Sequence, residues 1–430
     1  MEISKEEDAE MDKKKLLIYA HYYIPDAAST GQILCDLAEG MLKQFDITVI
    51  CVVPSYLGTI EDKYKTQKYY KENINGVKVL RIRVPGFSKT KKMSRIKNIV
   101  AYFFGALAAT FKVGKQDYIF SISQPPILGG LLGVWGKWVN HAKYIYNIQD
   151  FNPEQAMAVE YSKSKIFTRI MMMLDKFSCK RSDLIITVGR DLAETMQKRF
   201  HRKKMPKTVI INNWIDEKKI YPLPGNQPKV VEFKKKHNLD GKFVIMYSGN
   251  IGLYYDLENL MKVIEKFKNA KTTDGRNVSF AFVGAGSLLE KLIMYKENRH
   301  MDNVVFIPYQ DKENLIYSLN AADIHWCVNA KGIKGVSCPS KYYGVAAVGK
   351  PVIGVLERGS EIRCIIEETN GGLCCEPGDY VLVEQNINWF IDNAGTRNVI
   401  EMGNRGRKYL MDYLRKDLSV DKYTQAILNL

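Results

Sequence analysis

Residues 243–287, FVIMYSGNIGLYYDLENLMKVIEKFKNAKTTDGRNVSFAFVGAGS, contain the pattern that decides the fold. The apolar segments 243–248 and 278–283 predict strands, and the amphipathic segment 256–268 between them predicts a helix. Each predicted strand runs into a turn that contains glycine. A strand, a connecting helix and a second strand indicate two parallel strands in a sheet that is covered by helices.

The same alternation continues in both directions along the chain. The other predicted strands are 16–20, 47–53, 77–82, 118–122, 144–148, 184–188, 304–307, 324–328 and 352–355. The other predicted helices are 27–44, 286–298, 312–320, 340–348, 379–394 and a segment from about 398 onward. Ligands of open parallel sheets bind beyond the carboxyl ends of the strands, so we expect functional residues in the loops that follow the strands.

A break in the alternation falls at residues 212–230, where three prolines and a glycine predict a linker. With domains of about 150 residues as the norm, a chain of 430 residues has room for two or three. We expect an α/β protein of two Rossmann-like domains that face each other across a cleft. The domains are predicted at 11–212 and 231–398, with the linker at 213–230 and a C-terminal helical segment at 399–430 that crosses back to the first domain.

Composition excludes several classes of protein. Hydrophobic residues make up 46% of the chain and charged residues 26%, which is typical of folded domains and excludes disordered, collagen-like and coiled-coil chains. No run of 18 apolar residues is present, which argues against a spanning helix. The eight cysteines form no C-x-x-C pair, so we expect no metal site and a reduced, cytoplasmic setting. The acidic N-terminus is not a secretory signal, and either Met1 or Met11 could be the start.

Positive charge gathers in the first half of the chain. Residues 51–210 hold 29 basic and 11 acidic residues, which indicates an anionic partner, although charge that serves only solubility is an alternative. Within residues 89–112 a basic cluster precedes an uncharged stretch from Ile99 to Phe111. This stretch is too short to span a bilayer but can lie in its interface; a buried helix with basic flanks is the alternative. Nucleic-acid binding is not favoured, because no motif for it is present.

Two loops of the first half are candidate site loops. Thr30 and Gly31 open a helix after the first strand, where small residues allow close approach of an anion; an ordinary capped helix is the alternative. The loop contains no G-x-G-x-x-G, which argues against a dinucleotide dehydrogenase. Gln149 and Asp150 follow the strand at 144–148, and Asp150 either binds substrate or caps the next helix.

Three loops of the second half are also candidates. Glycines that follow strands let backbone N–H groups approach a phosphate. Gly249, Asn250 and Gly252 follow one strand, and Gly284 and Gly286 follow another. In the third loop, Ser340 and Lys341 begin a helix, where a lysine can meet a diphosphate; a solvated lysine is the alternative.

Read together, these motifs resemble the retaining GT-B glycosyltransferases of family 4, and in particular the bacterial fucosamine transferase-like and colanic-acid-type branch. The matching stretches are HYYIPDAASTGQ (21–32), QPPILGG (124–130), IQDFNPEQA (148–156), IINNWID (210–216), YSGNIG (247–252), FVGAGS (282–287), CPSKYYGVAAVGKPVIG (338–354) and GSEI (359–362). The resemblance implies a hexosyl or N-acetylhexosaminyl transferase in lipopolysaccharide or other cell-surface polysaccharide synthesis. It also implies a cytoplasmic enzyme attached peripherally to the inner face of the membrane.

The resemblance further implies how substrates are held. A nucleotide-sugar donor, usually UDP-linked, would bind the second domain, and a polyprenyl-diphosphate-linked or glycan acceptor would bind the first. Transfer would retain the anomeric configuration without a metal or other cofactor. By position, Lys341 would face the diphosphate and Asp150 the sugar. The other residues carried over are Thr30, Gly31, Gln149, Gly249, Asn250, Gly284 and Gly286, and Gly252 and Ser340 are further candidates for substrate binding.

The chain departs from the wider family at two places. The two family glutamates before the last strand fall on Val336 and Gly344, and an arginine and a lysine of the third loop fall on Asn250 and Asp256. Glu361 is the candidate for the missing carboxylate. Two rival functions stay open: a non-hydrolysing UDP-sugar 2-epimerase of the same architecture, and a non-catalytic protein that binds sugar nucleotides. The donor sugar, the acceptor and the oligomeric state are not predicted.

Overall fold

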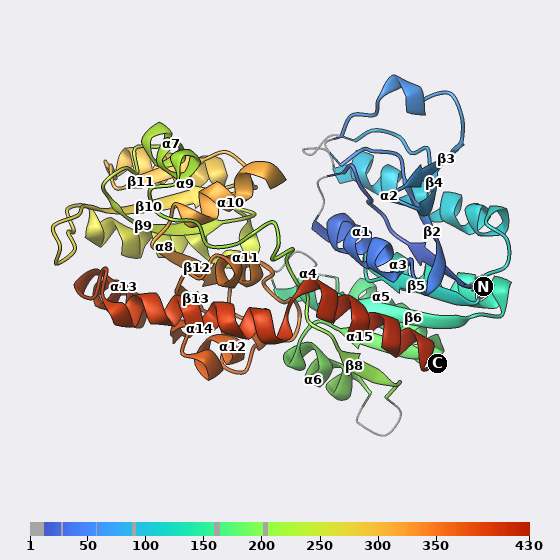
Figure 1. The fold of residues 1–430 in the computed structure, drawn as a ribbon. Helices are drawn as coiled ribbons and strands as arrows, with labels where there is room; N and C mark the ends of the chain where they lie inside the picture. Colours follow the sequence, from blue (N-terminus) through green and yellow to red (C-terminus); the bar gives the residue numbers. More distant parts are fainter. Residues whose placement is uncertain (1–12, 27–28, 57, 88–91, 159–163, 201–204) are drawn as a thin grey trace, which may run out of the picture.

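The computed structural model describes residues 13–26, 29–56, 58–87, 92–158, 164–200 and 205–430. Within them the chain forms two α/β domains, each built on its own sheet (Figure 1). The first sheet has the strand order β3-β4-β2-β1-β5-β6-β7-β8 and the second the order β11-β10-β9-β12-β13-β14. Every strand pair is parallel except the antiparallel pair β3–β4. The predicted fold class of two Rossmann-like domains is therefore confirmed.

The strands of both sheets are short. Those of the first sheet are β1 (Lys14–Tyr19), β2 (Phe45–Val52), β3 (Tyr69–Ile74), β4 (Val77–Ile82), β5 (Tyr118–Ile122), β6 (Lys143–Ile148), β7 (Leu184–Thr187) and β8 (Thr208–Ile210). Those of the second are β9 (Phe243–Ser248), β10 (Val278–Val283), β11 (Val304–Ile307), β12 (Ile324–Val328), β13 (Val352–Val355) and β14 (Gly372–Cys375). The predicted strands agree within two residues at each end.

Helices connect most of the parallel strands. Those of the first half are α1 (Ser29–Met41), α2 (Lys92–Ala109), α3 (Leu128–Asn140), α4 (Glu154–Ala158), α5 (Lys165–Arg181) and α6 (Arg190–Arg199). Those of the second half are α7 (Pro228–Lys236), α8 (Leu257–Ile264), α9 (Leu289–Asn298), α10 (Lys312–Asn320), α11 (Lys341–Ala347), α12 (Glu361–Thr369), α13 (Tyr380–Asp392), α14 (Arg397–Tyr413) and α15 (Lys416–Leu428). Short 3₁₀ turns lie at Asp62–Tyr64, Thr110–Lys112, Leu253–Tyr255 and Glu265–Phe267.

Helices cover both faces of the first sheet, and this explains why its strands read as nearly continuous apolar runs. On one face, side chains of α2, α3 and α5 pack in the same core as Leu17 and Tyr19. On the other face, side chains of α1 and α15 pack in the same core as Leu16 and Ile18. Consecutive residues of β1 thus enter opposite cores, as the period of two in a strand requires.

The C-terminal helix α15 belongs to the first domain although it follows the second in sequence (Figure 1). Val420, Tyr423 and Ile427 are buried against the first sheet. The predicted crossing back of the chain is therefore confirmed, but the predicted single segment 399–430 consists of two helices. α14 packs on α11 and α12 of the second domain, and the chain crosses between α14 and α15 beside an isolated bridge that joins Ile215 to Arg415.

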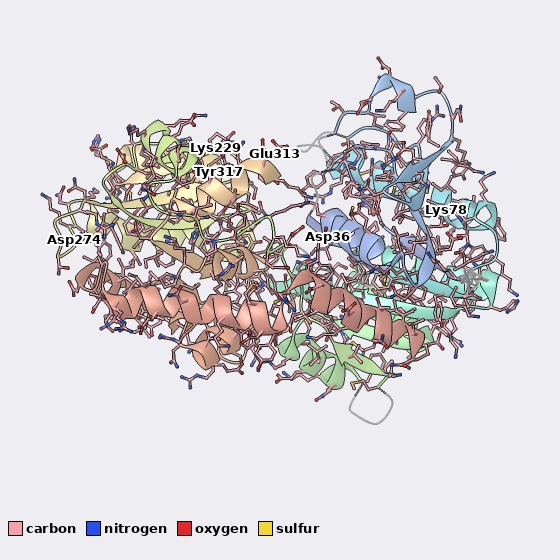
Figure 2. All side chains as sticks on the ribbon, viewed as in Figure 1. Asp36, Lys78, Lys229, Asp274, Glu313 and Tyr317 are labelled. Atoms are coloured by element: carbon pink, nitrogen blue, oxygen red, sulfur yellow. The ribbon has the colours of Figure 1, made fainter. Side chains whose placement is uncertain are left out.

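Polar contacts hold the crossing segment in place. Asp36 of α1, which is labelled in Figure 2, accepts a hydrogen bond from the Trp214 indole at 3.4 Å. The Asp36 carboxylate also lies 3.7 Å from the Lys416 ammonium. Lys416 also pairs with Asp216 at 2.8 Å. The stretch predicted as the linker thus has partners in both α1 and α15.

The second domain has a cation–aromatic contact between two of its helices. The Lys229 ammonium of α7 lies 5.0 Å from the ring centre of Tyr317 of α10 (Figure 2).

Some sequence predictions fall where the structure gives no description. Residues 27–28 of the first predicted helix, residues 89–91 of the basic cluster and both candidate start methionines lie outside the described residues. Within the described residues, no helix has both the length and the apolar character to cross a bilayer.

Candidate functional site

The loops that follow the strands of the two sheets meet at a cavity of about 200 Å³ between the domains. The first domain lines it with Thr30, Ile33, Ser123, Gln124, Gln149, Asp150, Gln155 and Asn213. The second lines it with Tyr254, Tyr255, Asn329, Ile333, Ser337, Cys338, Pro339, Ser340 and Lys341. The carboxyl ends of parallel strands are the usual place for a ligand, so this cavity is the candidate active site. Five predicted site residues line it: Thr30, Gln149, Asp150, Ser340 and Lys341.

The second domain contributes a positively charged side chain to the cavity, that of Lys341. This residue is the first of α11. Its ammonium nitrogen lies 3.6 Å from the ring centre of Tyr255 and 5.3 Å from that of Tyr247. A cation over an aromatic face is attracted by the ring, so the two tyrosines fix where the charge lies. The Lys341 side chain passes directly over Gly249, where a Cβ atom would overlap it. Gly249 therefore makes room for the lysine.

The two glycine turns of the second domain pack against each other beneath Lys341. Gly284 has a φ of 145°, and a Cβ there would overlap the carbonyl oxygen of Gly249. A Cβ on Gly286 would likewise overlap the carbonyl oxygen of Ile251. The Gly249 N–H donates to the Val283 carbonyl at 2.8 Å, which joins the turns.

These glycines lie behind the residues that line the cavity and do not line it themselves. Gly249, Gly252, Gly284 and Gly286 are not among the residues that line it, and neither is Asn250. A Cβ on Gly252 would lie 3.0 Å from the Asn250 amide nitrogen. The Asn250 carbonyl accepts a hydrogen bond of 2.6 Å from the Tyr247 hydroxyl, under the ammonium of Lys341. The loop therefore supports the Tyr247 ring, over which the Lys341 ammonium lies.

Asp150 reaches the cavity from the first domain and is held by both domains. Its N–H donates to the Ser123 hydroxyl at 3.3 Å, and its backbone forms an isolated antiparallel bridge with Ser337 of the second domain. The next residue, Phe151, donates its N–H to the Val336 carbonyl at 2.8 Å. Burial raises the pKa of the Asp150 carboxyl, and a hydrogen bond from the Ser337 side chain opposes this rise.

Gln149 lines the cavity, but its amide group is occupied by protein partners. Its oxygen accepts from the Asn213 amide at 2.7 Å, and its nitrogen donates to the Asn147 oxygen at 2.8 Å. The Asn147 amide in turn donates to the Tyr423 hydroxyl of α15 at 2.8 Å. A buried polar network of this kind fixes side-chain positions, so the returning helix helps to position Asn213 at the cavity wall.

The loop after β1 supplies Thr30, whose hydroxyl donates to the Gln124 side-chain oxygen at 2.6 Å. Its neighbour Gly31 does not line the cavity. A Cβ on Gly31 would lie 2.9 Å from the Tyr22 carbonyl oxygen, so this glycine allows α1 to pack closely on the preceding loop.

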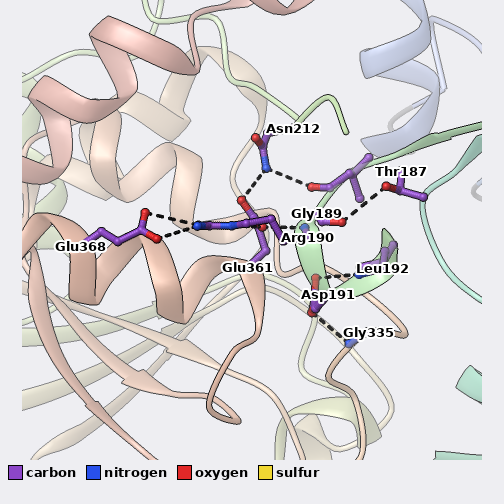
Figure 3. A network of polar contacts seen from close by, with 10 residues as sticks. Thr187, Gly189, Arg190, Asp191, Leu192, Asn212, Gly335, Glu361 and Glu368 are labelled. Atoms are coloured by element: carbon purple, nitrogen blue, oxygen red, sulfur yellow. Dashed lines mark hydrogen bonds and ion pairs between the residues drawn. The ribbon is translucent and has the colours of Figure 1, made fainter. Parts of the chain in front are cut away.

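Glu361 requires a correction, because the structure does not place it in the cavity. It is 3% exposed, and its carboxylate accepts from the Arg190 N–H at 2.7 Å, the Arg190 Nε at 2.9 Å and the Asn212 amide at 2.9 Å (Figure 3). Arg190 also pairs with Glu368 at 2.5 Å. Both carboxylate oxygens are therefore occupied by the first domain, and Glu361 joins the domains instead of binding a sugar.

A second contact between the domains lies beside this ion-pair network. The Asp191 carboxylate of α6 accepts a hydrogen bond of 2.9 Å from the Gly335 N–H (Figure 3). Gly335 belongs to the same loop as Ser337, which pairs with Asp150. Asp191 therefore fixes the loop of the second domain that closes over Asp150. Neither contact is visible as a sequence pattern.

Replacing Arg190 with alanine is expected to lower the free energy of unfolding by about 1–2 kcal/mol, because the buried Glu361 carboxylate loses its charged partner. Urea unfolding measures the change. Arg397→Ala is the matched control, because Arg397 is 91% exposed and pairs with Glu401 within one helix, so about 0.5 kcal/mol or less is expected. Equal effects of the two substitutions would show that the interdomain pair does not stabilise the protein.

Sequence reasoning left other side chains of the cavity unassigned, among them Gln124, Asn213, Tyr255 and Asn329. Each follows a strand, namely β5, β8, β9 and β12. The rule that ligands bind beyond strand ends covers all four, but only the fold shows that these four strand ends meet at one cavity.

Two Rossmann-like domains that face each other across a cleft, with a last helix that returns to the first domain, are the architecture of the GT-B fold. Comparison with known proteins agrees. Residues 230–409 match the family model described as Glycosyl transferases group 1. The chain is a glycosyltransferase with the GT-B fold, and the predicted enzyme class is confirmed.

Two curated relatives cover most of the chain. It is 26% identical over 357 residues to the probable glycosyltransferase WbjE of Pseudomonas aeruginosa, covering 80% of this chain and 83% of the relative. It is 22% identical over 375 residues to the putative colanic acid biosynthesis glycosyl transferase WcaI of Escherichia coli, covering 84% of this chain and 88% of the relative.

Solved structures share the fold at low sequence identity. The sucrose-phosphate synthase of Thermosynechococcus elongatus has a TM-score of 0.74 at 14% identity, covering 97% of this chain and 99% of that chain. Anabaena HepE in complex with UDP and glucose has a TM-score of 0.70 at 12% identity, covering 97% and 100%. At these identities the likeness supports the fold alone.

Proposed function

We propose that this enzyme transfers a sugar from a UDP-linked donor to a lipid-linked or glycan acceptor in the synthesis of a cell-surface polysaccharide, with retention of configuration and without a metal. The observation that carries the proposal is that Lys341 and Asp150, from opposite domains, line one cavity. Two further facts support it. The relative WcaI is named for colanic acid biosynthesis, and HepE is described with bound UDP and glucose.

Lys341 is assigned to the departing diphosphate. Breaking the bond between sugar and phosphate leaves negative charge on the diphosphate, and a fixed cation directed at that charge lowers the barrier. The ammonium of Lys341 is held between Tyr255 and the cavity, so it does not have to reorganise during the reaction. Ser340, beside it on the cavity wall, offers a hydroxyl for the same diphosphate.

Asp150 is assigned to the sugar. In a front-face transfer, the acceptor attacks on the side from which the diphosphate leaves, and a diphosphate oxygen takes the acceptor proton. Asp150 then needs only to accept hydrogen bonds from sugar hydroxyls. A double displacement would instead use Asp150 as the nucleophile that forms a covalent bond to the sugar. We favour the front-face route.

Asp150→Asn distinguishes these two routes. If Asp150 binds the sugar, kcat/KM is expected to fall about tenfold, which corresponds to about 1.4 kcal/mol, because one charged hydrogen bond becomes neutral. A nucleophile would lose about a thousandfold or more. Steady-state kinetics with mass spectrometry of the trapped protein measure both outcomes, and a glycosylated Asp150 peptide in the wild type would reject the front-face route.

The pH profile provides an independent measurement on the same pair of proteins. Because burial raises the pKa of Asp150, its carboxylate is protonated at a higher pH than an ordinary aspartate as the pH falls. The wild-type rate is therefore expected to decline on the acid side earlier than an ordinary aspartate would require. Asp150→Asn is expected to lack this decline, and an unchanged acid limb in the variant would remove the charge of Asp150 from the mechanism.

The overall activity is tested with a panel of UDP- and GDP-sugars and a lipid-extract acceptor, with mass spectrometry of the product and NMR of its anomeric configuration. A product heavier by one sugar unit, with the configuration of the donor, is expected. The UDP-sugar 2-epimerase is the second candidate. It would exchange a solvent proton into the UDP-sugar in the absence of acceptor, and it is not favoured because the relatives are named as glycosyltransferases.

Peripheral attachment to the inner face of the membrane is part of the proposal. The supporting element is α2, which carries Arg95 and Lys97 and exposes Met93, Ile96 and Phe104 to solvent. Basic residues are attracted to an anionic leaflet, and exposed apolar side chains enter its interface. A lipid-linked acceptor would then be presented to the first domain.

A further inference from the structure

A second helix of the first domain, α5, has the same unusual composition as α2. Ile166 is 73% exposed, Phe167 54%, Ile170 46% and Met173 62%. Their spacing puts most of them on one side of the helix, where a water-soluble protein ordinarily has polar residues. The helix also carries five basic residues: Lys165, Arg169, Lys176, Lys180 and Arg181.

Among the described residues, none of the five basic side chains of α5 takes part in an ion pair. Its single carboxylate, Asp175, is buried and paired with Arg199 of α6 and with the Tyr146 hydroxyl. The outer side of α5 is thus both apolar and cationic. A groove beside it is lined by Arg169, Met172, Met173, Lys176, Phe177 and Lys180.

α5 and α2 lie on the same face of the first sheet, with α3 between them. Trp138 of α3 is 51% exposed and lies edge-on to Phe177 of α5, with ring centres 6.0 Å apart. Among the described residues, ten of the twenty-one exposed large apolar side chains belong to these three helices and the turn after α2. They are Met93, Ile96, Val100, Phe104, Phe111, Trp138, Ile166, Phe167, Ile170 and Met173. We call this surface the α2–α3–α5 face.

The position of this face relative to the active site is fixed by topology. Connecting helices run antiparallel to their strands, so the N-terminal ends of α2 and α5 lie at the carboxyl edge of the sheet, where the cavity is. Gln155 lines the cavity, and α5 begins only ten residues later, at Lys165. Ile166, Phe167 and Ile170 are in the half of α5 nearest the cavity.

We infer that α5 is a membrane-docking helix that acts together with α2, and that the occupant of the α2–α3–α5 face is an anionic lipid bilayer. This inference rests on the proposed function and names the surface from which the enzyme takes its acceptor. A second copy of this chain is disfavoured as the occupant, because a two-fold contact through this face would bring like charges together. An anionic leaflet neutralises the basic residues while its interface takes up the apolar side chains.

The test is flotation of the full-length protein with phosphatidylglycerol–phosphatidylcholine vesicles at low salt. The variants are Ile166→Ser/Phe167→Ser/Ile170→Ser in α5 and Lys165→Gln/Arg169→Gln/Lys180→Gln in the same helix. Val381→Ser/Ile400→Ser is the control, because these exposed apolar residues lie on α13 and α14 of the second domain. Each α5 variant is expected to lower the bound fraction about tenfold or more, and the control is expected to bind as the wild type does. Wild-type protein is expected not to bind vesicles of phosphatidylcholine alone.

Wild-type flotation by the α5 variants would overturn the inference and leave the proposed function standing. Failure of the wild type to bind either vesicle would overturn it as well, as would a dimer that the apolar variant converts to a monomer. Turnover separates the two proposals. With a water-soluble acceptor the apolar variant is expected to match the wild type, and with the acceptor in vesicles it is expected to be slower. If wild-type protein floats but transfers no sugar from any donor, the proposed function fails while the docking surface remains.

Discussion

Lys341→Ala is expected to lower kcat by about 30- to 150-fold, which corresponds to about 2–3 kcal/mol of lost transition-state stabilisation. The ammonium is the only lysine or arginine charge among the residues that line the described cavity. It is held by the aromatic ring of Tyr255 at 3.6 Å. Since the diphosphate gains charge as it leaves, the loss is expected mainly in kcat, with a smaller rise in the donor KM.

The control for this prediction is Lys331→Ala, an exposed lysine ten residues earlier in the loop that ends at Lys341. It does not line the cavity and is expected to keep wild-type kinetics. Unfolding curves of both variants exclude a stability effect as the cause. Near-normal turnover of Lys341→Ala would remove this lysine from the diphosphate and would leave the cavity without its assigned cation.

Gly284→Ala is expected to lower the free energy of unfolding by about 3 kcal/mol or more and to abolish donor binding. Two costs add at this position. The φ of 145° is one that L-residues rarely adopt, and the added Cβ would overlap the Gly249 carbonyl oxygen. Relief of that overlap would move Gly249, over which the Lys341 side chain passes, so the cation is displaced as well.

Gly378→Ala separates the two costs. Gly378 also has a positive φ, of 96°, but a Cβ there meets no atom within 4 Å. The control is therefore expected to lose only about 1 kcal/mol and to bind donor normally. Thermal unfolding and UDP-binding calorimetry measure both variants. If the two substitutions cost the same, backbone strain alone explains the loss, and the close packing of the two glycine turns is unimportant.

Much of the fold could be predicted from sequence because strands buried on both faces have a distinctive composition. β1, β9 and β10 are short apolar runs, and their predicted positions agree with the structure. β3 and β14 could not be predicted in the same way. β3, with the sequence YYKENI, is a half-exposed edge strand, and β14 begins with glycine and is only four residues long. Their pairing with β4 and β13 makes them strands, and pairing is a tertiary property.

Among the residues of the candidate site, some could likewise be predicted from sequence and others could not. Lys341 and Asp150 could be predicted because each follows a recognisable strand and belongs to a motif. Glu361 was misinterpreted for the same local reason: a carboxylate near a motif resembles a ligand-binding group. Its real partners, Arg190 and Asn212, are more than a hundred residues away in sequence, so no local pattern could reveal them.

By itself, the sequence determined the alternation of strands and helices, the two-domain division and the loops in which functional side chains lie, because these depend on the spacing of residues that are near one another. The tertiary structure alone decided that Lys341 and Asp150 face one cavity, that Glu361 joins the domains and that α5 exposes its apolar side to solvent. Each of these depends on how the two sheets and their helices pack, and packing brings together residues whose separation along the chain carries no periodic signal.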